Sequence, residues 1–347
     1  MNYKDLENEW SRHWFQFIKD NPDKDWDWRY ICCNENLTWE IIQDNPDKPW
    51  RWGCLSENPN ITWKIVQANL DNDWCWSHIS LNPNITWAII QANPDKDWSW
   101  WGIARNPNIT WEIVQANLDK VWDWEKISEY ENLTWEIIQQ NLDKPWYWYR
   151  ISAHPNITLE IIQTNPDNAW NWSWISINPN ITWEIIQDNP DKDWDWRYLS
   201  YNQNITCEHI YANPDKEWDW RRMSCNPNIT WEFIQDQLDK PWYWKSLSFH
   251  TNITWEIIQQ NPDNPWDWEY ISENPNITWE IIQQNPDKQW NWKKISINTM
   301  KLGKKRWIIR ERLEHIKALQ IQRHWRNCSC NPEYKLAQRC LLRLHES

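Results

Sequence analysis

The stretch NPNITWEIIQDNPDKDWDW, residues 178–196, decides the fold, because nearly the same sequence recurs along most of the chain. It contains two tryptophans two residues apart, and pairs of this kind follow one another every 24 residues. A fixed period of this length is typical of a solenoid, in which each repeat packs on its neighbours. The 12 pairs are Trp26/Trp28, Trp50/Trp52, Trp74/Trp76, Trp98/Trp100, Trp122/Trp124, Trp146/Trp148, Trp170/Trp172, Trp194/Trp196, Trp218/Trp220, Trp242/Trp244, Trp266/Trp268 and Trp290/Trp292.

The local sequence of one copy, residues 60–83, predicts two short helices per repeat. Thr62 is placed to cap a helix, with apolar residues on both sides at the positions of a hydrophobic staple. We expect that first helix over residues 63–68. A second helix is expected in the following Trp-x-Trp-x-x-Ile-Ser segment. Proline just before the first Trp suits the first turn of that helix, and it occurs at Pro49, Pro145, Pro241 and Pro265.

A β-solenoid is the alternative fold. Trp-x-Trp alternates as a half-buried strand does, and Ile, Thr and Trp all favour strands. The tight corners of β-solenoids depend on glycine, however, and the chain contains only 3 glycines. The capping pattern also has no use at the start of a strand. We therefore predict an all-α fold, an α-solenoid or superhelix of about 12 repeats.

The tryptophan pairs are expected to form a structural ladder. Helices of six to eight residues are marginal alone, so each must be held by packing on the next repeat. A buried Trp removes roughly 150–250 Å² from water, so large side chains compensate for short helices. One Trp of each pair is expected to face the inner row and the other the neighbouring layer. The alternative is an exposed row of aromatics that binds sugar or peptide, which requires one exposed Trp per pair.

The repeat resembles a known family. Its 24-residue length, its paired NPN-T and NPD turns and its short helices resemble the leucine-rich repeat variant, over residues ~20–298. The resemblance implies alternating α and 3₁₀ helices in a superhelix. The tryptophan-rich sequence of the repeats is also similar to that of repeat proteins of giant DNA viruses. The tail sequence IQRHWRNCSCNPEYKLAQRCL looks like C-termini common among such viral proteins. Neither resemblance implies an enzymatic activity.

Composition divides the chain into three parts. We expect an N-terminal cap over residues 1–20, the repeat array over 21–298, and a basic helical tail or cap over 299–347. Residues 301–347 carry 12 Lys and Arg against 4 Asp and Glu, whereas the first 300 residues carry 24 against 45. An acidic array thus bears a basic tail. Gly303 is expected to mark a break, followed by a helix with Ile309, Leu313, Ile316 and Leu319 at helical spacing, and by a second helix from Asn331.

The tail holds the candidate partner-binding residues, which are Ile321, Gln322, Arg323, Trp325 and Arg326. They match the first half of a calmodulin-type IQ motif, although the second half departs from it. Trp325 beside two arginines has the composition of an interaction hot spot. The alternative role of Trp325 is to pack the tail onto the last repeat. A basic tail suits an acidic protein surface or nucleic acid.

No catalytic, metal or cofactor site is predicted. Three isolated glycines form no phosphate-binding loop. The alternation Asp23-x-Asp25-x-Asp27 begins like an EF-hand loop but lacks its glycine and its final glutamate. A zinc set of His324, Cys328, Cys330 and Cys340 matches no standard spacing. His154 and His250 replace a turn Asn and are interpreted as structural variants.

We therefore expect a non-enzymatic repeat scaffold that mediates protein–protein interaction, without a small-molecule substrate or a membrane segment. The alternative is a virion- or genome-associated structural protein whose basic tail binds nucleic acid. The expected location is cytoplasmic, in the host cytoplasm or in the virion if the protein is viral.

Overall fold

The computed structural model describes residues 3–330, except for the side chains of residues 324 and 326–330. The chain divides into two compact units, residues 23–299 and residues 1–22 with 300–347. Every regular element of the described residues is a helix and none is a strand, which confirms the predicted all-α solenoid.

The first helix of each repeat starts directly after a capping threonine. The first helices are α3 (Trp39–Asp44), α5 (Trp63–Ala68), α7 (Trp87–Ala92), α9 (Trp111–Gln115), α11 (Trp135–Gln140), α13 (Leu159–Thr164), α15 (Trp183–Asp188), α17 (Cys207–Ala212), α19 (Trp231–Asp236), α21 (Trp255–Gln260) and α23 (Trp279–Gln284). In α5 the hydroxyl of Thr62 accepts a hydrogen bond from the Ile65 amide at 3.4 Å. The helix ends at Asn69, whose side chain donates to the Ile65 carbonyl at 2.7 Å. The helix predicted over residues 63–68 is confirmed.

The second helix of each repeat starts at the second Trp of the pair. These helices are α2 (Trp28–Cys33), α4 (Trp52–Leu55), α6 (Trp76–Leu81), α8 (Trp100–Ile103), α10 (Trp124–Ile127), α12 (Trp148–Ser152), α14 (Trp172–Ile177), α16 (Trp196–Leu199), α18 (Trp220–Met223), α20 (Trp244–Phe249), α22 (Trp268–Glu273) and α24 (Trp292–Ile297). Where the residue between the two tryptophans is Asp, Asn or Ser, its side chain caps the helix; Asp195 accepts from the Arg197 amide at 3.1 Å.

The first turn predicted for the second helix is therefore wrong. Pro49 and the first Trp of its pair, Trp50, lie in a non-helical segment that precedes α4. The cause is a contact between repeats: Arg51 is extended, with φ −103° and ψ 96°, and its amide donates to Sγ of Cys32 in the preceding repeat at 3.2 Å, so the helix starts only after it. All helices of residues 23–299 are α-helices, so the 3₁₀ helices implied by the resemblance are not found there.

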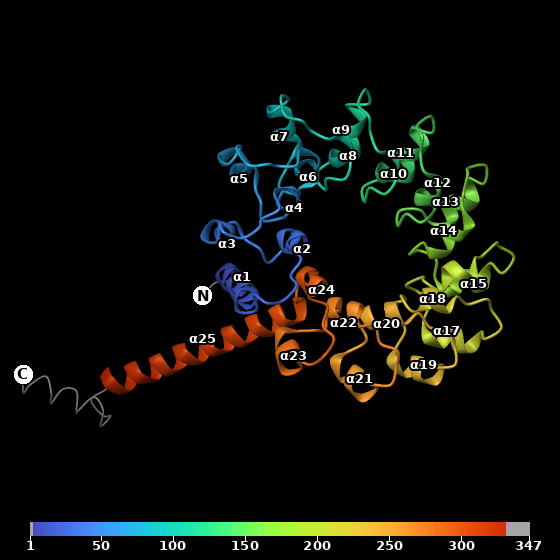
Figure 1. The fold of residues 1–347 in the computed structure, drawn as a ribbon. Coiled ribbons are helices and arrows are strands. Elements are labelled where there is room, and N and C mark those ends of the chain that lie inside the picture. The colour runs from blue at the N-terminus through green and yellow to red at the C-terminus, as the bar shows by residue number, and fades with distance from the viewer. Residues whose placement is uncertain (1–2, 331–347) are drawn as a thin grey trace, which may run out of the picture. The chain divides into compact units, whose positions relative to one another are not determined.

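The helices of residues 23–299 form two rows, with the second helices inside and the first helices outside (Figure 1). Neighbouring second helices pack on one another, as α6 does on α8 and α20 does on α22. Between the rows lies a core of one Ile, Leu, Val or Met from each element. In the middle of the array this core contains Ile175, Ile181 and Ile186, all at most 4% exposed.

The array closes on itself. Helix α2 packs against α24, at the other end of the array. The Asp27 amide donates to the Ser296 hydroxyl at 3.0 Å, and the Asn34 side chain donates to the Ser296 carbonyl at 3.1 Å. Trp26 meets Trp292 edge-to-face with centroids 5.2 Å apart.

These contacts reproduce those between successive repeats, where the Asp195 amide donates to Ser176 at 2.9 Å. Residues 23–299 are therefore a closed ring, as the circle of helices in Figure 1 shows. The predicted superhelix is therefore closed, because its first and last repeats pack against each other.

The other unit contains the helices α1 (Tyr3–Asp20) and α25 (Lys301–Cys330). They pack together through Trp10 and Trp307, whose rings are 5.8 Å apart. The break predicted at Gly303 is wrong, because this residue is buried inside α25. The helix starts instead after Met300, whose φ is 53°. The second helix predicted from Asn331 lies outside the described residues. No helix of residues 3–330 has both the length and the apolar content needed to cross a bilayer.

Candidate interaction surface

The tryptophan ladder joins each repeat to the next. The second Trp of one repeat meets the first Trp of the following repeat edge-to-face, as Trp172 meets Trp194 at 5.3 Å. Twelve such contacts run around the ring, with centroids 4.9–5.4 Å apart and planes at 75–90°. This geometry is the favoured one for aromatic pairs.

No tryptophan of the 12 pairs is exposed: each is buried or half-buried. The first Trp also has its indole N–H satisfied; that of Trp194 donates to the Asn189 carbonyl at 2.8 Å. The pairs therefore do not supply the one exposed Trp each that sugar or peptide binding by this row requires. The pairs are part of the packed interior between repeats.

Buried asparagines and serines complete the contact between repeats. The Asn178 side chain donates to the carbonyls of Ser152, His154 and Ile157 in the preceding repeat, at 2.9, 3.0 and 3.0 Å. Its oxygen accepts from the Asn180 amide at 2.8 Å. Because Asn178 is fully buried, loss of these bonds would leave buried polar groups without a hydrogen-bond partner.

His154 occupies such an Asn position and makes equivalent bonds. Its Nδ1 accepts from the Asn156 amide at 3.1 Å, and its Nε2 lies 2.9 Å from the Tyr130 carbonyl. These two partners require the neutral imidazole with the proton on Nε2. Burial lowers the pKa of His154 below its ordinary value, which favours the same form. His250 makes the same two contacts, with Asn252 and Asn226.

Three positions of the second helix vary from repeat to repeat, whereas the first helix hardly changes. A threonine precedes all 11 first helices, and an exposed Gln stands at the same place in 10 of them. Exposed side chains occur at two of them, the residue after the second Trp and the residue four places later, whereas the second residue after that Trp is buried or half-buried in every repeat. These two side chains share one face of the helix.

We name these residues the variable face. They are Arg29, Cys33, Gly53, Glu57, Ser77, Leu81, Trp101, Arg105, Glu125, Glu129, Tyr149, Ala153, Ser173, Ile177, Arg197, Tyr201, Arg221, Cys225, Lys245, Phe249, Glu269, Glu273, Lys293 and Ile297. None of them is buried. Trp101, Tyr201 and Phe249 are exposed by 52%, 49% and 44%. The face carries six cations and five carboxylates, so it is nearly neutral in an array that is strongly acidic.

Aromatic rings and guanidinium groups form a continuous cluster on and beside the variable face. Tyr149 packs on Trp174 at 5.0 Å, and Trp174 packs on Tyr198 at 6.0 Å. Arg150 lies over Trp174 at 5.6 Å and Arg222 over Tyr198 at 4.2 Å. Aromatic and Arg side chains dominate binding energy at protein interfaces.

Ion pairs hold one end of this cluster. Arg150 pairs with Glu125 at 2.7 Å and with Glu129 at 2.8 Å, and these residues line a pocket of about 310 Å³ with Arg105 and Lys126. The hydroxyl of Tyr149 also donates to Glu125. This hydrogen bond and that from Arg150 lower the pKa of Glu125.

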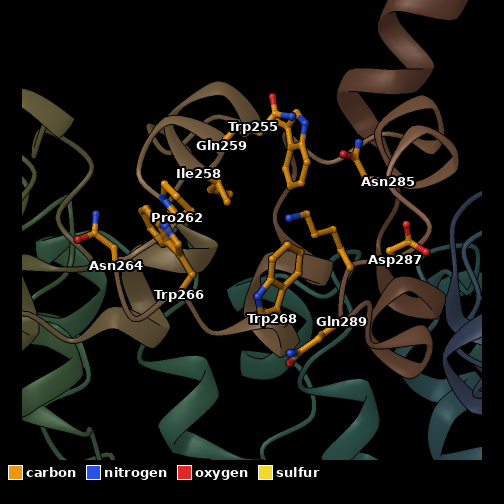
Figure 2. A pocket seen from close by; sticks show the side chains of 11 residues that line it. Trp255, Ile258, Gln259, Pro262, Asn264, Trp266, Trp268, Asn285, Asp287 and Gln289 are labelled. Carbon is orange, nitrogen blue, oxygen red and sulfur yellow. The ribbon is translucent and has the colours of Figure 1, made fainter.

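A pocket lies between two repeats on the ring. Figure 2 shows its indole walls, Trp255, Trp266 and Trp268, around a volume of about 510 Å³. Lys288 of the chain itself lies over Trp268, 5.9 Å from its centroid. Lys216 lies over Trp196 in the same way, at 4.7 Å. The pocket therefore belongs to the common packing of the repeats and does not single out one of them.

The predicted tail residues lie on α25. Ile321, Gln322, Arg323 and Trp325 are exposed, Ile321 by 68% and Trp325 by 59%. The side chain of Arg326 lies outside the described residues.

The acidic motif at residues 23–27 caps a helix, and the side chains of the zinc set lie outside the described residues. Asp27 caps α2 and pairs with Arg29 at 2.6 Å. No group of three His, Cys, Asp or Glu side chains in the described residues could hold a metal ion. Of the zinc set, Cys340 and the side chains of His324, Cys328 and Cys330 lie outside the description.

These features define a class, a tryptophan-rich helical repeat protein whose 24-residue repeats close into a ring. Comparison of the chain with protein-family models, curated proteins and solved structures found no match. The sequence analysis missed the variable face. An alignment of the repeats shows different residues at the first and fifth positions after the second Trp, and this variation is the signal that could have found the face.

Proposed function

We propose that the protein is a non-enzymatic scaffold that binds a protein partner on the variable face of the ring. The observation that carries the proposal is the contrast between the two helices of each repeat. The first helix keeps even its exposed Gln, whereas the second helix changes its exposed residues in charge, size and polarity. A surface that is different in every repeat can distinguish one partner from another.

The chemistry of the variable face favours a protein over nucleic acid. Its cations and carboxylates nearly balance, and several arginines are already paired; Arg29 pairs with Asp27 and Arg197 with Asp195. Nucleic-acid binding needs an excess of unpaired positive charge along the contact. Exposed Trp101, Tyr201 and Phe249 instead supply the aromatic anchors typical of protein interfaces.

We further propose that the protein is viral and acts in the host cytoplasm or in the virion. The support is the similarity of its tryptophan-rich repeats and its tail to those of giant-virus proteins, with a repeat related to the leucine-rich repeat variant. A second candidate function is a virion- or genome-associated structural role in which the tail binds nucleic acid. The basic, exposed helix α25 favours that candidate.

Affinity capture from host cells with matched variants tests the proposal. The test variant replaces Trp101, Tyr201 and Phe249 with Ala. The control variant replaces Leu70, Leu118 and Leu238, which are exposed to the same degree in turns outside the variable face. We expect the captured protein to be lost with the test variant and retained with the control. Loss with both variants, or retention with both, contradicts the proposal.

A further inference from the structure

A groove runs between α1 and α25, within the second unit. It encloses about 440 Å³ and is lined by Tyr3, Glu7, Lys301, Lys304, Lys305, Ile308, Ile309 and Arg312. We name it the basic groove. Neither the variable face nor the residues Ile321–Arg326 take part in it.

Four cations line the basic groove against one carboxylate. Glu7 pairs with Lys304 at 3.2 Å, so a carboxylate already occupies one position. Lys301, Lys305 and Arg312 have no ion pair with any described residue. Three unpaired cations along the groove together produce a positive potential, which attracts an acidic ligand.

The rest of the groove is apolar. Ile308 is 4% exposed and forms its floor, while Ile309 and Tyr3 are exposed by 49% and 57% at its edge. A phosphate backbone needs only the cations and gains nothing from such a floor. A peptide with acidic and apolar side chains uses both features.

We propose that the basic groove binds an acidic peptide segment of a partner protein. Its carboxylates meet Lys301, Lys305 and Arg312, and an aromatic or aliphatic side chain packs on Ile308. Lys301 and Arg312 are eleven residues apart on α25, which places the contacts over about 16 Å. The proposal rests on the proposed scaffold function in one respect only, that the partner is a protein.

Fluorescence anisotropy with the full chain tests this site. The probe is a labelled 16-residue peptide of alternating Glu and Tyr, and the competing probe is a single-stranded DNA oligonucleotide of equal charge. The test variant is Lys301→Glu, Lys305→Glu and Arg312→Glu. The control variant is Arg306→Glu, Arg310→Glu and Lys317→Glu, which changes the net charge equally at residues that do not line the groove.

We expect the peptide to bind more tightly than the DNA, and the test variant to weaken peptide binding about ten-fold or more. The control variant should weaken it by no more than about three-fold, through the general charge alone. Equal losses in both variants, no peptide binding at all, or tighter binding of DNA through the same cations would overturn the proposal. Alanine substitutions at Trp101, Tyr201 and Phe249 should leave peptide binding unchanged, so a failure of the proposed scaffold function is distinguished from a failure here.

Discussion

Replacement of Trp194 with Ala should weaken the ring more than any cap substitution. Trp194 is only 8% exposed, meets Trp172 edge-to-face at 5.3 Å, and donates its N–H to the Asn189 carbonyl. The indole joins two repeats, so its loss opens a gap in the interface between them. Neighbouring repeats cannot close that gap, because each indole of the ladder is held by its own partners.

The expected loss is about 3–5 kcal/mol of unfolding free energy. Burial of roughly 150–250 Å² at about 25 cal/mol per Å² gives an upper value of about 4–6 kcal/mol. Measured Trp-to-Ala losses in cores lie at about 3–5 kcal/mol. The half-buried Trp172 beside the gap lets water enter, which keeps the loss inside that range.

Urea unfolding followed by far-ultraviolet circular dichroism measures this loss as a change in midpoint at constant slope. The matched control is Thr182→Ala, which removes the cap of α15. Its hydroxyl accepts from the Ile185 amide at a long 3.4 Å, so we expect a loss of about 1 kcal/mol or less. If the Trp194 variant lost no more than the Thr182 variant, the ladder would not be the source of cohesion between repeats.

Three more predictions concern single sites. Gly102→Ala should destabilise the protein by about 1–3 kcal/mol, because the added Cβ would lie 2.6 Å from the Ser77 carbonyl oxygen. Gly53→Ala has room for the Cβ and should stabilise the protein slightly. Thermal melts of both variants check these two outcomes. Asn178→His should be tolerated while Asn178→Ala loses at least about 1–3 kcal/mol in urea melts, because a histidine at an equivalent position, His154, keeps one bond to the preceding repeat and the bond from the amide two residues later. Because burial lowers the pKa of His154, the unfolded chain binds the proton first as pH falls, so this residue's contribution to stability is complete above about pH 6.5 and is lost below it. Urea midpoints at pH 7 and pH 5 should therefore differ less in a His154→Asn variant than in the wild type.

The first helix of each repeat could be predicted residue by residue. Thr62 and Asn69 act on the backbone within four residues, so local sequence contains all the information that fixes α5. The start of the second helix was misplaced because a contact with the preceding repeat overrides the local signal there. Pro49 suits a first turn, but the Arg51 amide donates to Cys32 of the preceding repeat, which keeps this segment extended and sets the helix start at Trp52.

Ring closure could not be predicted from the repeat alone. It depends on the small rotation between successive repeats, about 30° each for a full turn in 12 repeats, and that angle follows from packing rather than from local preference. The variable face needed the structure for a similar reason. Two positions four residues apart become one surface only once α2, α4 and the following second helices stand side by side.

Closure of the ring is tested most directly by zero-length carbodiimide cross-linking of the wild-type chain. Lys293 and Asp25 lie at opposite ends of the array in sequence, yet their side chains are 3.3 Å apart. Lys294 and Glu273, 3.2 Å apart in successive repeats, give the internal reference. Mixing ¹⁵N-labelled and unlabelled protein at high dilution separates cross-links within one chain from those between chains. We predict a cross-link from Lys293 to Asp25 within one chain, in a yield comparable to the reference. Formation of the reference cross-link without the Lys293–Asp25 cross-link would show that the array is an open superhelix.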